Sequence, residues 1–356
     1  MSYIDEIMGF DPSNLDAFQE TVSNSSNYDV NIYKTNPVKL SKSEDGHYRA
    51  RVRVIYNPFD VKKSIVPQAT YFLKDADGSL LVRSKLGDGD KTCPIFTAWK
   101  KLWFAPESDP DQAKKKQWAK DMFDKTESQW CLVQILEDEN QPELVGKILA
   151  WKLPKTIFTK MSAKMNPSAE SKKTPVPVMD YILGLPLDLD VAPGPDDPNA
   201  PERKQREISY DLCDFDKDYT PIVKVDGTPL FDESELETID NYASAREEAV
   251  KGKTAAKREA ATKTVQDLTE NMRVLYQKAL DYLKANTFDI VKECGYQEWD
   301  EYTKNRVQHW IDCVLQLQNP QQHVQIKEAV VITPTEPDPQ NDVLDMATGQ
   351  IPDLPF

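Results

Sequence analysis

The sequence predicts an α+β protein with a strand-rich region followed by a helical one. Residues 47–233 contain several segments in which apolar and polar side chains alternate, which is the period of a half-buried strand. From residue 234 the apolar spacing changes to alternating threes and fours, which is typical of paired helices. We therefore divide the chain into a polar acidic arm at 1–46, a strand-rich core at 47–233, a helical hairpin at 234–329 and a disordered acidic tail at 330–356.

Composition sets limits on the class of protein. The 356 residues are 39% hydrophobic, enough for one large domain or two ordinary ones. No apolar run approaches the roughly 20 residues of a membrane helix, and the acidic N-terminus lacks the basic flank of a signal peptide. We expect a soluble, cytoplasmic protein that does not bind a membrane. The cysteines, scattered and odd in number, indicate free thiols: Cys93, Cys131, Cys213, Cys294 and Cys313.

The charge is distributed unevenly along the chain. The net charge is −15, yet residues 47–105 carry 11 basic and 5 acidic side chains. Residues 192–240 carry 5 basic and 14 acidic side chains, and residues 331–356 carry 5 acids and no base. Because distant exposed charges are screened over about 8 Å at physiological salt, one basic region can bind a polyanion within an acidic chain.

The first strand of the core is predicted in HYRARVRVIYN at residues 47–57, after a short helix at 11–22 in the arm. Arg49, Arg51 and Arg53 alternate with apolar residues, so the strand has one cationic face. That face is either a phosphate-binding surface or an ordinary solvated face.

The remaining elements follow from turn and period signals. Residues 69–84 and 128–153 predict hairpins, the second around an acidic turn at 137–143. Residues 93–104 predict a helix with Lys100 and Lys101 beside an aromatic stripe, and a second helix opens at Pro154. A proline-rich loop covers 167–201, and strand patterns resume from residue 207.

Two amphipathic helices are predicted after residue 234. The first carries an apolar seam from Val265 to Tyr282, and the second carries Trp299, Tyr302 and Trp310. With Gly295 in the connection, we expect these helices to pair as an antiparallel hairpin against the strand-rich core or against a second subunit.

No constellation of catalytic residues is found, so we expect a protein that is not an enzyme and needs no cofactor. The three histidines have no partners at metal-ligand spacing, and GDGDKT at 87–92 lacks the distal Glu of a calcium loop, which favours a tight turn. What remains is a surface of cations and aromatic rings, which is typical of proteins that bind single-stranded nucleic acid. The aromatic candidates, each with core packing as the alternative, are Tyr56, Tyr71, Phe72, Trp99, Trp103, Trp151, Phe215 and Tyr219.

Three blocks carry a family resemblance: GDGDKTCPIF, SQWCLVQILEDENQPELVGKILAWKLPKTIFTKM and DLCDFDKDY. In this order they resemble the core of the single-stranded DNA-binding, helix-destabilising proteins of T-even-like bacteriophages. The resemblance covers about residues 47–235 and implies an OB-fold β-barrel with inserted short helices and a cleft for the strand.

The resemblance implies roles for particular residues. Trp151 and Lys152 match an aromatic residue and a following arginine that line the family's cleft, and Phe215 and Tyr219 match its Phe and Tyr pair. Arg53 falls near a DNA-contacting arginine across an alignment gap. With these and the basic strand we expect the DNA-binding set to be Arg49, Arg51, Arg53, Tyr56, Tyr71, Lys100, Trp103, Lys147, Trp151, Lys152, Lys155, Phe215 and Tyr219.

The sequence also departs from the family. Of the family's zinc ligands only Cys93 remains, so we expect no metal, with Ile95 and Phe96 filling that region. The family's basic N-terminus, which drives cooperative binding, is acidic here at residues 1–10. The helical hairpin is then expected to provide self-association.

The C-terminal tip resembles the acidic Pro-Phe end of bacterial single-stranded DNA-binding proteins, which recruits replication and repair partners. Asp353, Leu354, Pro355 and Phe356 therefore form the expected partner-binding motif, with a frayed terminus as the alternative. The tail carboxylates are also expected to compete with DNA for the cationic groove.

Together these features predict a sequence-independent single-stranded DNA-binding protein. It would coat replication or recombination intermediates in the cytoplasm of a bacterial host and recruit partner enzymes through its tail. The alternative is an adaptor whose OB domain and helical hairpin bind only proteins. Single-stranded RNA is not distinguished from DNA by stacking and phosphate contacts.

Overall fold

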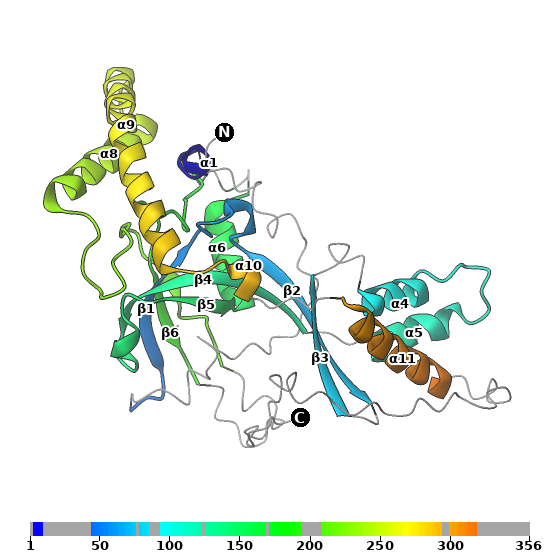
Figure 1. The fold of residues 1–356 in the computed structure, drawn as a ribbon. Coiled ribbons are helices and arrows are strands. Elements are labelled where there is room, and N and C mark those ends of the chain that lie inside the picture. The colour runs from blue at the N-terminus through cyan, green and yellow to red at the C-terminus, as the bar shows by residue number, and fades with distance from the viewer. Residues whose placement is uncertain are drawn as a thin grey trace.

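The chain forms one antiparallel sheet with helices around it, which confirms the predicted α+β class (Figure 1). The sheet has seven strands and remains open along the path β3-β2-β4-β1-β6-β7, with β5 paired to β4. The computed structural model describes residues 3–9, 44–75, 78–85, 93–122, 126–168, 171, 173–193, 208–293 and 299–318.

Strand β4 (Thr126–Asp138) is the centre of the sheet because it pairs with three others. Strand β1 (Tyr48–Ile55) pairs along residues 132–138, β2 (Val66–Asp75) along 126–130, and β5 (Ile148–Leu153) along 129–134. Its successive residues Cys131, Leu132 and Val133 are all buried, as expected of a strand covered on both faces.

Both predicted β-hairpins are confirmed. Strand β2 pairs antiparallel with β3 (Gly78–Lys85), with Asp75 opposite Gly78. Strands β4 and β5 pair on either side of the acidic turn, which includes a 3-10 helix at Pro142–Leu144. The predicted helices are present as α4 (Pro94–Trp103) and α6 (Lys155–Met165).

The main body consists of β1, β4, β5, β6 (Leu187–Val191) and β7 (Asp214–Phe215) with helices α6, α8 and α9. Helices α8 (Glu233–Lys251) and α9 (Ala255–Asn286) form an antiparallel hairpin, and a capping box of Asp232 and Glu235 begins α8. The short helix α1 (Tyr3–Met8) packs against α9, and the short helix α10 (Ile290–Glu293) follows it.

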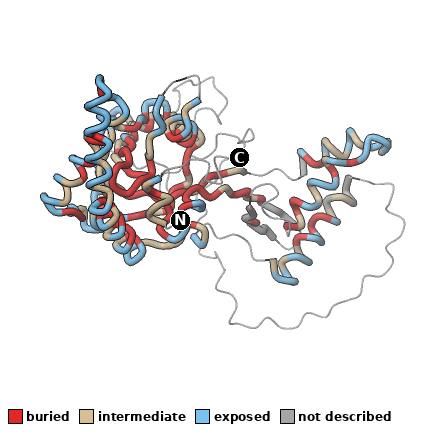
Figure 2. Tube along the Cα trace, turned by 90° about the horizontal axis from the view of Figure 1, so that it is seen from above, coloured by how far each residue is buried: buried red, intermediate tan, exposed pale blue. Residues whose placement is uncertain are grey.

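A second lobe lies beside β2 and β3, away from the rest of the sheet, and we call it the α4 lobe (Figure 1). Its core contains β2 and β3 residues together with α4, α5 (Gln112–Met122) and α11 (Glu301–Gln318). The buried residues of the lobe and those of the main body form two separate clusters, and Figure 2 shows buried residues in both parts.

The predicted pairing of the two C-terminal helices is wrong. Helix α9 pairs with α8, whereas α11 packs on α4 and β2. The reason is a stripe of Val307, Trp310 and Ile311 at helical spacing, which is buried together with the apolar face of α4. The helical hairpin therefore spans α8 and α9, and residues 234–329 are not one unit.

A fully buried arginine links three parts of the main body. Arg53 of β1 is 0% exposed and donates to the carbonyl of Asp180. The Asp180 carboxylate accepts from the backbone N–H groups of Ile182 and Leu183 and from the Tyr276 hydroxyl of α9, all at 2.8 Å. Burial raises the pKa of Asp180 and lowers the pKa of Arg53 to about 10, and the charge of each partner opposes the shift in the other.

Gly184 leaves room for this arginine. A Cβ atom at residue 184 would lie 2.7 Å from Arg53 Nη2 and 2.5 Å from the carbonyl oxygen of Asp180. Any side chain here would displace the guanidinium, so the close approach requires glycine.

We expect Asp180→Ala to lower the free energy of unfolding by about 3–5 kcal/mol, because it leaves a buried cation without its counter-charge. Urea denaturation measures the change, with the exposed Asp218→Ala as the control. The double variant Arg53→Met/Asp180→Asn removes both charges, so its free energy of unfolding should fall by less than that of Asp180→Ala. A loss below about 1 kcal/mol for Asp180→Ala would contradict the role of this pair.

Candidate nucleic-acid interface

The predicted arginine face of β1 is matched by aspartates on β6. The antiparallel register places Arg49 opposite Asp190 and Arg51 opposite Asp188. Each Nε atom lies 3.7 Å from its partner's carboxylate. The motif Leu-Asp-Leu-Asp-Val at 187–191 has the same alternation as the arginine strand, and this signal could have indicated the pairing.

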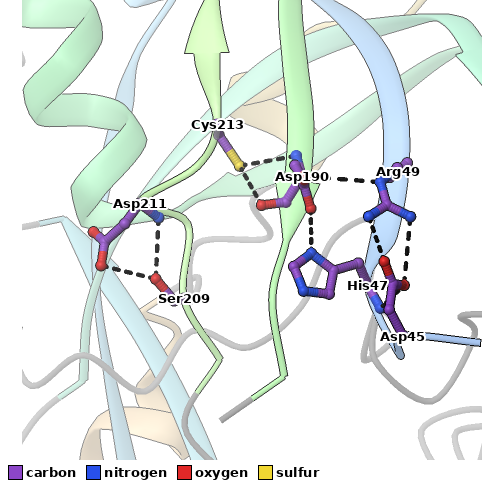
Figure 3. Close-up of polar contacts among 7 residues, drawn as sticks. All are labelled: Asp45, His47, Arg49, Asp190, Ser209, Asp211 and Cys213. Carbon is purple, nitrogen blue, oxygen red and sulfur yellow. Dashed lines mark hydrogen bonds and ion pairs between the residues drawn. The ribbon is translucent and has the colours of Figure 1, made fainter. Parts of the chain in front are cut away.

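Further carboxylates surround the same arginines, and Figure 3 shows those around Arg49. Arg49 Nη2 lies 2.6 Å from Asp45, whose pKa this hydrogen bond lowers to about 2, and Arg51 pairs with Asp216. His47 Nδ1 lies 2.5 Å from Asp190. The face is therefore charge-balanced, and a phosphate would have to displace carboxylates to reach Arg49 or Arg51.

Five residues of the predicted DNA-binding set belong to the core. Because they are buried, they present no ring or guanidinium surface to a bound nucleic acid. For the four aromatic residues among them, the alternative of core packing is therefore correct. Arg53 acts instead as the buried partner of Asp180. The five are Arg53, Tyr56, Tyr71, Trp151 and Phe215.

The other members fall into two groups. Lys147 is exposed before β5, while Lys152 of β5 and Lys155 of α6 are half-buried on the main body. Tyr219 is half-buried, and its hydroxyl donates to Asp240; burial raises its pKa. Lys100 and Trp103 lie on the α4 lobe, so the structure does not bring the set together (Figure 1).

The α4 lobe carries a stack of aromatic rings. Along α4, Phe96 stacks on Trp99 with centroids 5.7 Å apart and planes at 18°, and Trp99 stacks on Trp103 at 5.6 Å and 15°. Phe104, 65% exposed, meets Trp99 edge-on at 6.2 Å. We call these four residues the aromatic ladder. The spacing of three and four residues aligns Phe96, Trp99 and Trp103 on one side of α4, and Phe104 directly follows the helix.

The ladder forms because α4 has two apolar sides. Pro94 begins the helix, and Ile95 and Leu102 are buried in the lobe core, which anchors α4. Ile95 and Phe96 both pack in that core, so the prediction that they fill this region is confirmed. Trp99 and Trp103 are only partly buried, and their rings are therefore partly open to a ligand.

Lysines lie beside the ladder. The Nζ atoms of Lys100 and Lys120 lie 5.9 Å from the ring centroids of Phe96 and Trp103, within cation–π range. Lys101 of α4 and Lys114 of α5 are exposed on the same lobe, and Lys114 pairs with Asp111 at 3.2 Å. Lys100 and Trp103 were predicted from the sequence, but Lys120 was missed because it comes from the next helix.

The described part of the chain offers little else for chemistry. Within it no group of three or more His, Cys, Asp or Glu side chains is placed to hold a metal ion. None of the helices described there has the length and apolar character needed to cross a membrane.

Cys213 is buried, and its Sγ atom lies 3.3 Å from the backbone nitrogen of Asp190 (Figure 3). Burial raises the pKa of its thiol to about 11. Because the thiolate is the nucleophile, only about one molecule in a thousand is reactive at pH 8.

We expect iodoacetamide at pH 8 to alkylate Cys313, which is half-buried on α11, well before Cys213. Labelling of Cys213 should accelerate by about tenfold per pH unit above pH 8, as the thiolate fraction grows, and should level off only near pH 11. Peptide mass spectrometry of native protein measures both rates, and urea-unfolded protein, in which both thiols react, is the control. Equal native rates at pH 8 would contradict the burial of Cys213.

No protein-family model matches the chain, and no curated protein matches it. The predicted tail motif, Asp353 to Phe356, lies outside the described residues, as do the predicted arm helix and the side chain of Phe72.

Proposed function

We propose that this chain is a sequence-independent single-stranded DNA-binding protein that stacks bases on Trp99, Trp103 and Phe104, the members of the aromatic ladder that are not buried. The observation that carries the proposal is the parallel stack of Phe96, Trp99 and Trp103 with Lys100 and Lys120 over its rings. Every base has a π-face, so a stack of rings binds bases with little dependence on their identity.

Magnitudes favour the rings over the cations as the main source of binding energy. Stacking contributes about 1–3 kcal/mol per base, whereas each exposed lysine gains a phosphate contact that weakens with salt. Phe104, the most exposed member, contributes the most accessible ring. Lys100, Lys101 and Lys120 would then follow the phosphates of the stacked nucleotides.

The wider proposal follows the resemblance of residues 47–235 to phage single-stranded DNA-binding proteins. We propose that the open sheet of the main body is related to an OB fold, with Lys147, Lys152, Lys155 and Tyr219 as secondary contacts. The tail from Asp353 to Phe356 would recruit replication or recombination enzymes to coated strands in the cytoplasm of a bacterial host.

A second candidate function is an adaptor that binds only proteins. Two exposed aromatic residues of the α4 lobe favour it, Phe104 at 65% and Tyr302 at 74% exposure, because aromatic anchors dominate protein interfaces. Fluorescence separates the two: oligo-dT should quench tryptophan emission at low salt if bases stack on the ladder.

We expect Phe104→Ala and Trp103→Leu each to weaken binding of oligo-dT by about 5- to 150-fold, the equivalent of losing one stacked base. The anisotropy of a labelled oligonucleotide measures the affinity without relying on the altered tryptophan. Trp103→Leu keeps an apolar side chain at the position, which limits the effect on folding.

The matched control is Phe59→Ala, which removes a ring that is 45% exposed on the main body. It should leave the affinity unchanged. If both ladder variants bind like the control, the ladder is not the stacking site. If the unaltered protein neither binds nor is quenched by oligo-dT at low salt, the adaptor replaces the DNA-binding function.

A further inference from the structure

We propose that the tip of the α8–α9 hairpin is a second nucleic-acid contact, one that binds backbone phosphate without reading or stacking bases. The hairpin tip, defined as residues 250–264, contains five basic side chains and one acidic one. This proposal rests on the proposed function, since it assigns the same ligand to a separate surface.

The basic residues of the hairpin tip are exposed and largely unpaired. Lys251 pairs with Glu247 at 3.0 Å. No ion pair joins Lys253, Lys257 or Lys263 to any described residue, and all three are exposed. An exposed cation with no counter-ion of its own can release condensed counterions by binding a phosphate, which is the source of backbone affinity.

The turn itself is held in one conformation. The Thr254 side chain accepts from the backbone of Lys257 and caps α9. Arg258 Nη1 donates to the carbonyl of Gly252 at 2.8 Å, and a Cβ at residue 252 would lie 2.5 Å from the carbonyl oxygen of Glu248. The backbone that carries the lysines is therefore ordered before any ligand arrives, which reduces the entropy lost on binding.

The composition of the hairpin tip favours phosphate over other partners. Between Tyr242 and Tyr276 the sequence has no aromatic residue, so no base can stack there as on the ladder. Lysine is depleted from protein interfaces, whose energy comes from aromatic and arginine anchors. A lysine-rich surface without rings suits a phosphate backbone, which is contacted independently of sequence.

The position of the hairpin tip separates it from the ladder. Helix α9 runs from the tip down to the sheet, so the tip points away from the main body (Figure 1). The α4 lobe lies at the opposite end of the molecule. A single-stranded DNA that contacts both the ladder and the hairpin tip would pass along the main body. The ladder would bind its bases, and the hairpin tip would bind its phosphates.

The test compares Lys253→Ala/Lys257→Ala/Lys263→Ala with the control Lys173→Ala/Lys217→Ala/Lys224→Ala, which also removes three exposed charges. Anisotropy of labelled 40-mer oligo-dT is measured at 50, 100 and 200 mM salt. The hairpin variant should show a salt slope shallower by about 2, since each phosphate contact on single strands contributes about 0.7. The ratio of its dissociation constant to that of the unaltered protein should fall by about 16-fold between 50 and 200 mM salt.

The outcomes are distinguishable from failure of the proposed function. Quenching of tryptophan emission at saturation should be the same in the hairpin variant, because the ladder is intact. If the unaltered protein binds oligo-dT and the hairpin variant has the slope of the control, the second contact is refuted while the ladder stands. If the unaltered protein does not bind at all, the proposed function itself fails.

Discussion

The buried contact between Arg53 and Asp180 is the constraint on which the main body depends. A guanidinium without water must have a counter-charge and hydrogen bonds nearby. The backbone carbonyl of Asp180 accepts one hydrogen bond from the guanidinium, and the negative charge of its carboxylate favours the charged form of Arg53. Tyr276 of α9 donates to that carboxylate. Strand β1, the segment at 177–184 and the long helix α9 are thereby fixed to one another, which sets where the α8–α9 hairpin leaves the sheet.

The first strand shows how far the sequence could be interpreted. Its two-residue period predicts β1 correctly, and the same period places Arg49 and Arg51 on one face. The period does not tell which elements cover each end of the strand. Arg53 is buried because α9 and the segment at 177–184 close over it, and Arg49 and Arg51 are neutralised by aspartates about 140 residues away in the chain. These contacts depend on tertiary packing, which a single sequence does not reveal.

The α4 lobe is a second case in which the sequence predicts the elements but not their tertiary contacts. Helical spacing predicts both α4 and the stripe of Val307, Trp310 and Ile311, yet an apolar stripe specifies that a helix packs and not on what it packs. Lys100 and Trp103 could be predicted from the sequence because both lie on the single helix α4. Lys120 required knowing that α5 folds back beside α4. The proposed interface lies on α4 rather than on β1, because Arg49 and Arg51 of β1 already pair with carboxylates.

Ultraviolet crosslinking of the full chain to oligo-dT, followed by mapping of the modified peptides, tests the central claim most directly. We expect crosslinks on the aromatic ladder, within residues 96–104, since stacked thymine lies against those rings. Competition with unlabelled oligo-dT should remove them. Crosslinks confined to β1 and β5, with none on α4, would contradict the ladder as the site of base stacking.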